Sequence, residues 1–179
     1  HKNMEIISYI RSGAISHQDS TGNKGITKSG EVQVMSAGSG IVHSEYNRTK
    51  DALTFYQIWI ETDQLNVKPR WESKAFPNEA VSTQLPLIVS GYPEDQGKAL
   101  FIHQVARIFG GKVTKGAKFE HTINHQAYIL ASEGSFELQD SSSKITLMKG
   151  DGAEVTKSKM VTITALTNCE IVLIDAPKN

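Results

Sequence analysis

Hydrophobic and polar residues alternate along most of the chain in short runs. The runs are rich in Ile, Val, Thr, Tyr and Phe, and clusters of Gly, Ser, Asn and Asp separate them. Such runs favour β-strands, and helical periodicity is scarce. In the first part of the chain the predicted strands are residues 5–10, 14–17, 31–35, 41–46 and 53–61. This spacing predicts a small antiparallel barrel or sandwich.

The apolar pattern dissolves between residues 62 and 84, where Pro69, Pro77 and many polar residues occur. A stretch of this kind is typical of a linker between two lobes. We place the boundary near Glu79, with an amino-terminal lobe over residues 1–78 and a carboxy-terminal lobe over residues 79–179.

Strand-like runs return in the second half, separated by turns at Gly110-Gly111, Glu133-Gly134 and Gly150-Asp151-Gly152. The predicted strands are residues 98–109, 112–114, 119–122, 126–131, 135–139, 144–148, 153–156, 160–166 and 170–175. Both halves are therefore expected to be all-β.

The two halves can be aligned on their turns. Residues 9–13 match residues 130–134, and residues 28–30 match residues 148–150. Seventeen residues separate Gly13 from Gly30 in the first half, and sixteen separate Gly134 from Gly150 in the second. A duplicated barrel is the simplest explanation.

Composition narrows the function classes. The 179 residues carry 19 Lys plus Arg and 19 Asp plus Glu, so the formal net charge is zero and no direct nucleic-acid partner is expected. Apolar runs reach only about five residues, as over 127–131, which predicts no membrane helix. The single cysteine, Cys169, allows no internal disulfide and points to a reducing compartment, the cytoplasm by default. A monomer is expected.

The candidate for chemistry is His1 together with the segment His43-Ser44-Glu45. Side chains two apart on a strand point the same way, so His43 and Glu45 should face one side together. Two imidazoles and a carboxylate suit non-haem Fe(II), and related sets hold Mn, Co, Ni, Cu or Zn. An isolated His-x-Glu on a strand is more often a solvated face or a satisfied histidine.

Several motifs resemble known families. His1-x-x-x-Glu5 resembles the second half of the first cupin motif, and the second motif is matched by Gly30, Gly38, His43 and Asn47. More specifically, the chain resembles the pirin family and its bacterial quercetinase-like branch. The stretches that carry this resemblance are residues 4–6, 17–20, 22–23, 35–45 and 56–60.

The resemblance implies a bicupin built of two jelly-roll barrels, with one metal held by three histidines and a glutamate in the first. His1 matches the second of these histidines, His43 the third, and Glu45 the glutamate. The first histidine would precede His1, so we expect a segment upstream and a weakened or empty site. Glu5 is expected to be a partly buried, hydrogen-bonded carboxylate near the site.

The resemblance also implies a function: oxidative ring cleavage of flavonols such as quercetin by dioxygen. The expected cofactor is one divalent transition metal, Fe(II) first, with Cu, Ni, Mn, Co or Zn as alternatives. Glu45 could accept the flavonol hydroxyl proton as a general base. Phe55, Ile58 and Trp59 could line a cavity for a flat substrate, although alternation allows only one of the sets 55/57/59 and 56/58/60 to face inward. The alternative is a non-enzymatic, metal-binding regulatory or protein-interaction pirin.

The second lobe lacks the same pattern. When the turns are aligned, Thr122 is the equivalent of His1, and Glu120 lies two residues before it, so no His-x-His is present. No histidine follows Gly150. We predict that this lobe is metal-free. Single residues such as His17, His103 and Cys169 are expected to be structural, the cysteine as a buried inert thiol.

Overall fold

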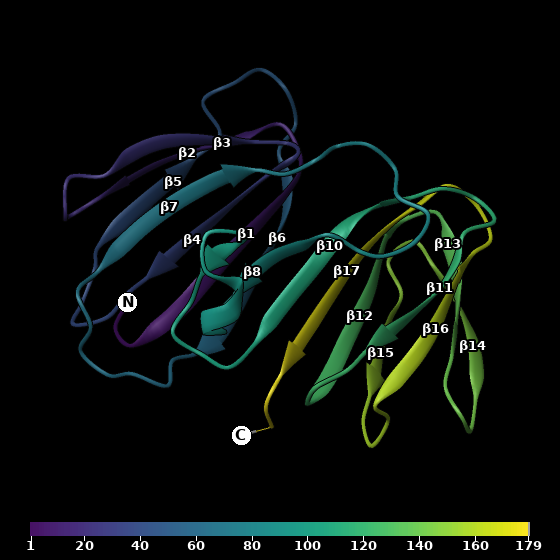
Figure 1. Cartoon of the computed structure of the whole chain (residues 1–179). Helices are drawn as coiled ribbons and strands as arrows, with labels where there is room; N and C mark the ends of the chain where they lie inside the picture. Colours follow the sequence, from purple (N-terminus) through teal and green to yellow (C-terminus); the bar gives the residue numbers. More distant parts are fainter. Residues whose placement is uncertain (179) are drawn as a thin grey trace. The chain divides into compact units, whose positions relative to one another are not determined.

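The computed structural model describes residues 1–178, and strands make up nearly all of its regular structure (Figure 1). The chain divides into two compact units. Unit 1 comprises residues 1–76 and 90–105, and unit 2 comprises residues 77–89 and the chain from residue 106 onward. The predicted all-β architecture with two barrels is confirmed.

Unit 1 contains two antiparallel sheets, with strand orders β6-β1-β4-β7 and β3-β2-β5. A 3₁₀ turn at Pro93–Asp95 and the short strand β9 (Leu100–Phe101) also belong to this unit. The bounds are β1 (Met4–Ser12), β2 (Ala14–Asp19), β3 (Lys24–Lys28), β4 (Glu31–Ser36), β5 (His43–Tyr46), β6 (Thr54–Glu61) and β7 (Arg70–Ala75).

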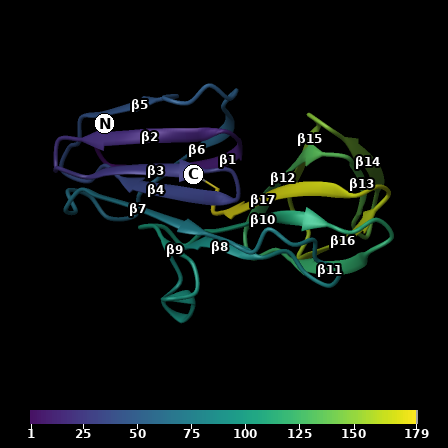
Figure 2. The same cartoon turned by 90° about the horizontal axis from the view of Figure 1, so that it is seen from above.

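Unit 2 has the same two-sheet plan, with orders β15-β12-β17-β10-β8 and β11-β16-β13-β14. Figure 2 shows these two sheets as two rows of strands. The bounds are β8 (Leu87–Ser90), β10 (Arg107–Val113), β11 (Lys118–Thr122), β12 (Gln126–Glu133), β13 (Ser135–Gln139), β14 (Lys144–Met148), β15 (Gly152–Val155), β16 (Met160–Ala165) and β17 (Cys169–Ala176).

The core of unit 2 lies between its sheets and is almost wholly apolar. Phe136, Ile129, Ile163 and Leu173 are fully buried within one cluster of side chains. Unit 1 buries its own apolar cluster around Ile6, but its interior also holds several polar side chains. Buried polar groups need hydrogen-bond partners, so the difference points to unit 1 as the place to look for a site.

The duplication is visible in the backbone. Gly13 (φ 75°) and Gly134 (φ 67°) occupy matching left-handed turns between β1 and β2 and between β12 and β13. A register shift precedes each glycine, between Ile10 and Ser12 on β1 and between Ala131 and Glu133 on β12. The predicted turn alignment therefore corresponds to equivalent strands.

Three expectations about elements were wrong. The stretch 62–84 is no simple linker, because it contains β7, which pairs along its length with β4. This edge strand is largely polar, so its sequence lacks an apolar signature. Gly110 and Gly111 form no turn, since both lie within β10 and pair with β17. The predicted strand 98–109 is interrupted, with residues 100–101 in β9 and β10 beginning at residue 107.

The unit boundaries can be set beside the predicted one. The chain first passes from unit 1 to unit 2 between residues 76 and 77, close to the predicted boundary near Glu79. Residues 90–105 return to unit 1, which a single boundary did not anticipate. In the part of the chain that the structure describes, the 3₁₀ turn is the only helix, so no helix could span a membrane.

Candidate metal centre

Strands β2 and β5 bring three potential metal ligands together. The antiparallel register pairs His17 with Glu45 and Asp19 with His43. Because side chains alternate across a strand, all four point to the same face of this sheet. The ligand atoms of His17, His43 and Glu45 lie within 4.8 Å of one another.

The cluster has two imidazole nitrogens that lack partners. Nδ1 of His17 and Nδ1 of His43 each lie 3.6 Å from Oε1 of Glu45. Both nitrogens are buried and have no hydrogen-bond partner among residues 1–178. A carboxylate oxygen can only accept, so this arrangement is satisfied by a proton or a cation among the three atoms. The donor set fits a divalent transition metal.

Asp19 fixes the ring of His17. Its Oδ2 lies 2.8 Å from Nε2 of His17, and its Oδ1 accepts hydrogen bonds from the backbone N–H and the hydroxyl of Thr21. Burial alone would raise the pKa of Asp19, but the hydrogen bonds from Thr21, His17 and Asn23 outweigh burial and hold that pKa well below its usual range. An ionised Asp19 leaves Nδ1 as the nitrogen of His17 that faces the cluster.

The two histidines differ in electrostatic environment. Burial alone would lower the pKa of His17, but the carboxylates of Glu45 and Asp19 together raise it above the ordinary value. For His43, burial lowers the pKa and the neighbouring His17 adds to that effect, while Glu45 opposes it. A neutral imidazole is the form that binds metal, so His43 is suited to coordination.

Glu45 is held by side-chain amides. Gln33 donates from Nε2 to Oε1 of Glu45 at 2.7 Å, and Gln57 donates to Oε2 at 3.4 Å. Trp59 in turn donates from its indole nitrogen to Oε1 of Gln57 at 3.0 Å. The carboxylate is thus oriented from β4 and β6 as well as from its own strand.

His1 lies beside the cluster. Its ring centroid is 5.0 Å from that of His43 and 4.9 Å from that of Trp59. The backbone of His1 exchanges two hydrogen bonds with Ile41, which anchor the residue. The structure therefore gathers all three residues predicted as ligands, His1, His43 and Glu45, in one region.

His17, which sequence reasoning treated as structural, belongs to the same cluster. Its ring stacks on Trp71 at 5.0 Å between centroids. Trp71 comes from β7, and a Cβ on Gly25 would lie 2.2 Å from its ring, so a glycine is needed there. The missing signal was the register of β2 against β5, which only the paired strands reveal.

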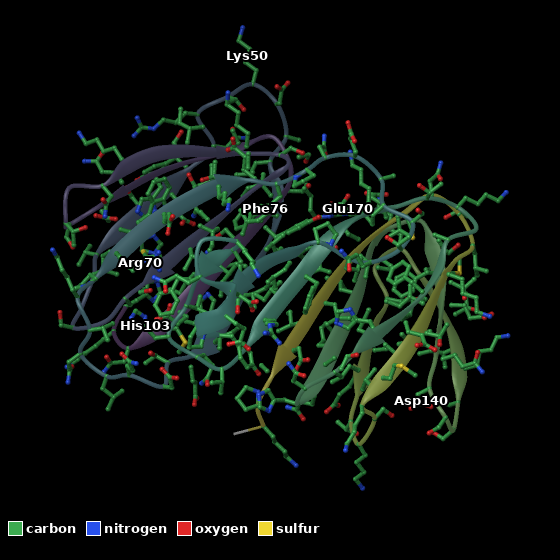
Figure 3. The ribbon with its side chains drawn as sticks, viewed as in Figure 1. Lys50, Arg70, Phe76, His103, Asp140 and Glu170 are labelled. Carbon is green, nitrogen blue, oxygen red and sulfur yellow. The ribbon has the colours of Figure 1, made fainter. Side chains whose placement is uncertain are left out.

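Other candidates lie elsewhere. Glu5 is fully buried, but it points to the other face of β1, where it accepts from Ser36 at 2.7 Å and lies 3.2 Å from Nδ1 of His103. His103 and Arg70, which donates to the carbonyl of Phe101, are labelled in Figure 3. The expectation that Glu5 lies near the site was wrong. Glu5 and Ser8 point to opposite faces of β1, because side chains alternate along a strand, and Ser8 is the one that faces Gln33.

Side-chain alternation on β6 places the set 55/57/59 toward the cluster, as the contacts of Gln57 and Trp59 show. Ile58 therefore points away from it.

In unit 2 the equivalent positions are apolar. His17 lies four residues after Gly13, and Leu138 lies four residues after Gly134, so the two positions are equivalent. Their cross-strand partners, Glu45 and Ile163, are equivalent as well. Among residues 1–178, the His17, His43 and Glu45 group is the one cluster with metal-ligand spacing. Cys169 is buried, and burial raises the pKa of its thiol to about 11, as an inert thiol requires.

Comparison with known proteins agrees with these observations. The Pirin family model matches residues 1–60, and the model of the quercetinase C-terminal cupin domain matches residues 87–176. A pirin-like protein of Caulobacter vibrioides is 40% identical over 98% of this chain and 75% of its own length. Quercetin 2,3-dioxygenase of Escherichia coli K12 is 33% identical over 99% of this chain and 74% of its own length.

Solved structures give the same result. The bacterial pirin YhhW from Escherichia coli, in complex with nickel(II), aligns with a TM-score of 0.87 at 31% identity. The alignment covers 100% of this chain and 75% of YhhW.

Proposed function

The chain belongs to the pirin family, and on this premise we propose that it is a metal-dependent dioxygenase that cleaves the ring of flavonols such as quercetin. The observation that carries the proposal is the pair of buried, unpartnered nitrogens on His17 and His43 that face one carboxylate oxygen of Glu45. Relatives named quercetin 2,3-dioxygenase and a nickel(II) complex of a similar pirin support it.

His1, His43 and Glu45 would hold the ion, with Nδ1 of His17 as a further donor in the same group. The donor set suits Fe(II), Ni(II) and related divalent ions. When bound, such an ion would supply Lewis acidity and a template for the oxygen atoms of the substrate.

The chain's own residues would prepare the substrate. Glu45 would accept the flavonol hydroxyl proton, and this role is supported by the position of its Oε1 between the two imidazoles. Trp59 is 53% exposed beside His1, and its ring would offer an aromatic face to a flat substrate. Trp71 stacks on the ring of His17, whose side chain is fully buried.

The test is oxygen uptake with quercetin by protein loaded in turn with Fe(II) and Ni(II). We expect His43→Ala and Glu45→Ala to weaken metal binding and to lower turnover by about 100-fold or more, because removal of a ligand should exceed the effect of an outer partner. His125→Ala, in unit 2, is the matched control and should leave both unchanged. Metal binding without oxygen uptake by the loaded wild-type chain would instead favour the regulatory alternative.

A further inference from the structure

Behind Glu45 lies a short chain of buried hydrogen bonds. Gln33 on β4 is 2% exposed and Thr27 on β3 is fully buried. The hydroxyl of Thr27 donates to Oε1 of Gln33 at 2.9 Å, and Nε2 of Gln33 donates to Oε1 of Glu45 at 2.7 Å. Ser8 on β1 lies 3.5 Å from the same amide nitrogen.

The donor and acceptor groups determine the direction of each hydrogen bond in this series. An ionised carboxylate only accepts, so the amide must turn its nitrogen toward Glu45. The hydroxyl of Thr27 binds the amide oxygen and favours that same orientation. Thr27 therefore fixes which end of Gln33 meets the carboxylate, and Gln33 fixes the position of Oε1, the oxygen that faces both imidazoles.

Unit 2 shows what the fold does without such a chain. Counting from the turn glycines matches Ser8 with Ile129, and the strand registers extend the match to the neighbouring strands. Six polar members of the unit 1 group are replaced by apolar residues. The pairs are Ser8 and Ile129, His17 and Leu138, Thr27 and Leu147, Gln33 and Ala153, Glu45 and Ile163, and Gln57 and Leu173.

The same barrel plan is thus built with an apolar interior in one unit and a polar one in the other. Burial of polar groups is costly unless each finds a partner, so the fold alone gives no reason for Thr27 and Gln33. Both occur in the unit that also has Glu45, and both connect to it. Their presence is explained if they orient that carboxylate.

We propose that Gln33 is a positioning residue for Glu45, and that Thr27 sets the orientation of the Gln33 amide. The inference rests on the proposed function, because it takes Glu45 as a metal ligand. Outer partners of metal ligands orient the ligand and tune affinity, and their loss typically weakens metal binding by about tenfold to 100-fold.

The experiment compares four variants of the full chain. Gln33→Met keeps the length of the side chain but removes the hydrogen bonds of the amide to Thr27, Glu45 and Ser8, and Thr27→Val removes only the hydroxyl. Thr27→Ser restores a hydroxyl and serves as the conservative rescue. Gln104→Met, in unit 1 and away from Glu45, controls for loss of a glutamine.

Two readouts separate positioning from stability: the Kd for Ni(II), and the visible spectrum of the Co(II)-loaded protein. Gln33→Met should raise the Kd by about tenfold to 100-fold and change the Co(II) spectrum. Thr27→Val should shift both in the same direction but less, while Thr27→Ser and Gln104→Met should resemble the wild type. A wild-type Kd and spectrum in both Gln33→Met and Thr27→Val would overturn the proposal.

Crystal structures of the metal-free wild type, Gln33→Met and Thr27→Val keep the two proposals distinguishable. If the wild type binds no Ni(II), the proposed function fails, and the position of Glu45 still tests Gln33. We expect the 3.6 Å separation between Oε1 of Glu45 and Nδ1 of His43 to change in both variants. An unmoved carboxylate would count against Gln33 even in a protein that binds metal well.

Discussion

Asp19 and Asp140 are equivalent aspartates that close equivalent turns. Each lies six residues after its turn glycine, and each accepts hydrogen bonds from the residue two further on, Thr21 in unit 1 and Ser142 in unit 2. In unit 1 the aspartate also binds His17, whereas in unit 2 it accepts from Ser158. One local structure therefore serves the site in one unit and only the fold in the other.

Asp140, labelled in Figure 3, gives a prediction for pH. Hydrogen bonds from the backbone of Ser142, the hydroxyl of Ser158 and the backbone of Ser143 hold the pKa of Asp140 below its usual range. A lowered folded-state pKa contributes stability that is present above the unfolded pKa, about 3.9, and is lost as the pH falls toward the folded value. Asp140→Asn should lower the melting temperature at pH 7, and the difference should shrink below about pH 4.

Thermal melts of both proteins between pH 2 and pH 7 check this expectation. Asp51→Asn, on an exposed loop of unit 1, provides the background effect of losing one carboxylate. A melting difference for Asp140→Asn that stayed constant down to pH 2 would show that the carboxylate charge is not what stabilises the turn.

At the scale of elements, the strands with alternating apolar residues could be predicted and the others could not. β7 is an edge strand whose sequence, Arg-Trp-Glu-Ser-Lys-Ala, carries one large apolar residue, so its pairing with β4 left no pattern to detect. β10 contains two glycines that resemble a turn, but the paired β17 holds them extended.

His43 and Glu45 share a strand, and their spacing was enough to predict a shared face. His17 comes from another strand, so its place depended on a register that sequence periodicity does not encode.

The turn glycines give a prediction about elements. Gly134 has φ 67°, and a Cβ there would lie 2.3 Å from the carbonyl oxygen of Asn168. Gly150 has φ 91° with nothing within 4 Å of its Cβ position. Alanine at either site meets the left-handed backbone penalty of about 1 to 2 kcal/mol. Only Gly134→Ala adds a clash with backbone, which should cost a further 1 to 3 kcal/mol, roughly the range for overpacking.

Denaturant unfolding of Gly134→Ala and Gly150→Ala measures the difference within one unit. Equal losses of stability in the two variants would mean that the turn can shift away from Asn168, and that the close approach is not needed for the β12 to β13 connection.

At the scale of the whole molecule, the two units share the order of their central strands, β4-β1-β6 and β3-β2-β5 in unit 1 and β15-β12-β17 and β14-β13-β16 in unit 2. They differ in the side chains that fill their interiors. Unit 1 has a polar interior and unit 2 an apolar one, so the unfavourable free energy of burying polar site residues falls on unit 1 alone. The apolar core of unit 2 has no donors at the matching positions, since Leu138, Ile163 and Leu173 stand there. Metal binding should therefore stabilise the two units unequally.

Amide hydrogen exchange measured with and without Ni(II) tests this asymmetry. An ion at about 100 times its Kd favours the bound folded state by about 2.7 kcal/mol, and local openings that break the site are opposed by the same amount. Exchange should slow in β2, β4 and β5, which carry His17, Gln33, His43 and Glu45, and should stay unchanged in β13, β15 and β16. Glu45→Ala should abolish the effect. Equal slowing in β13 and β16 would contradict a site confined to unit 1, because no side chain at the matching positions there can bind a metal.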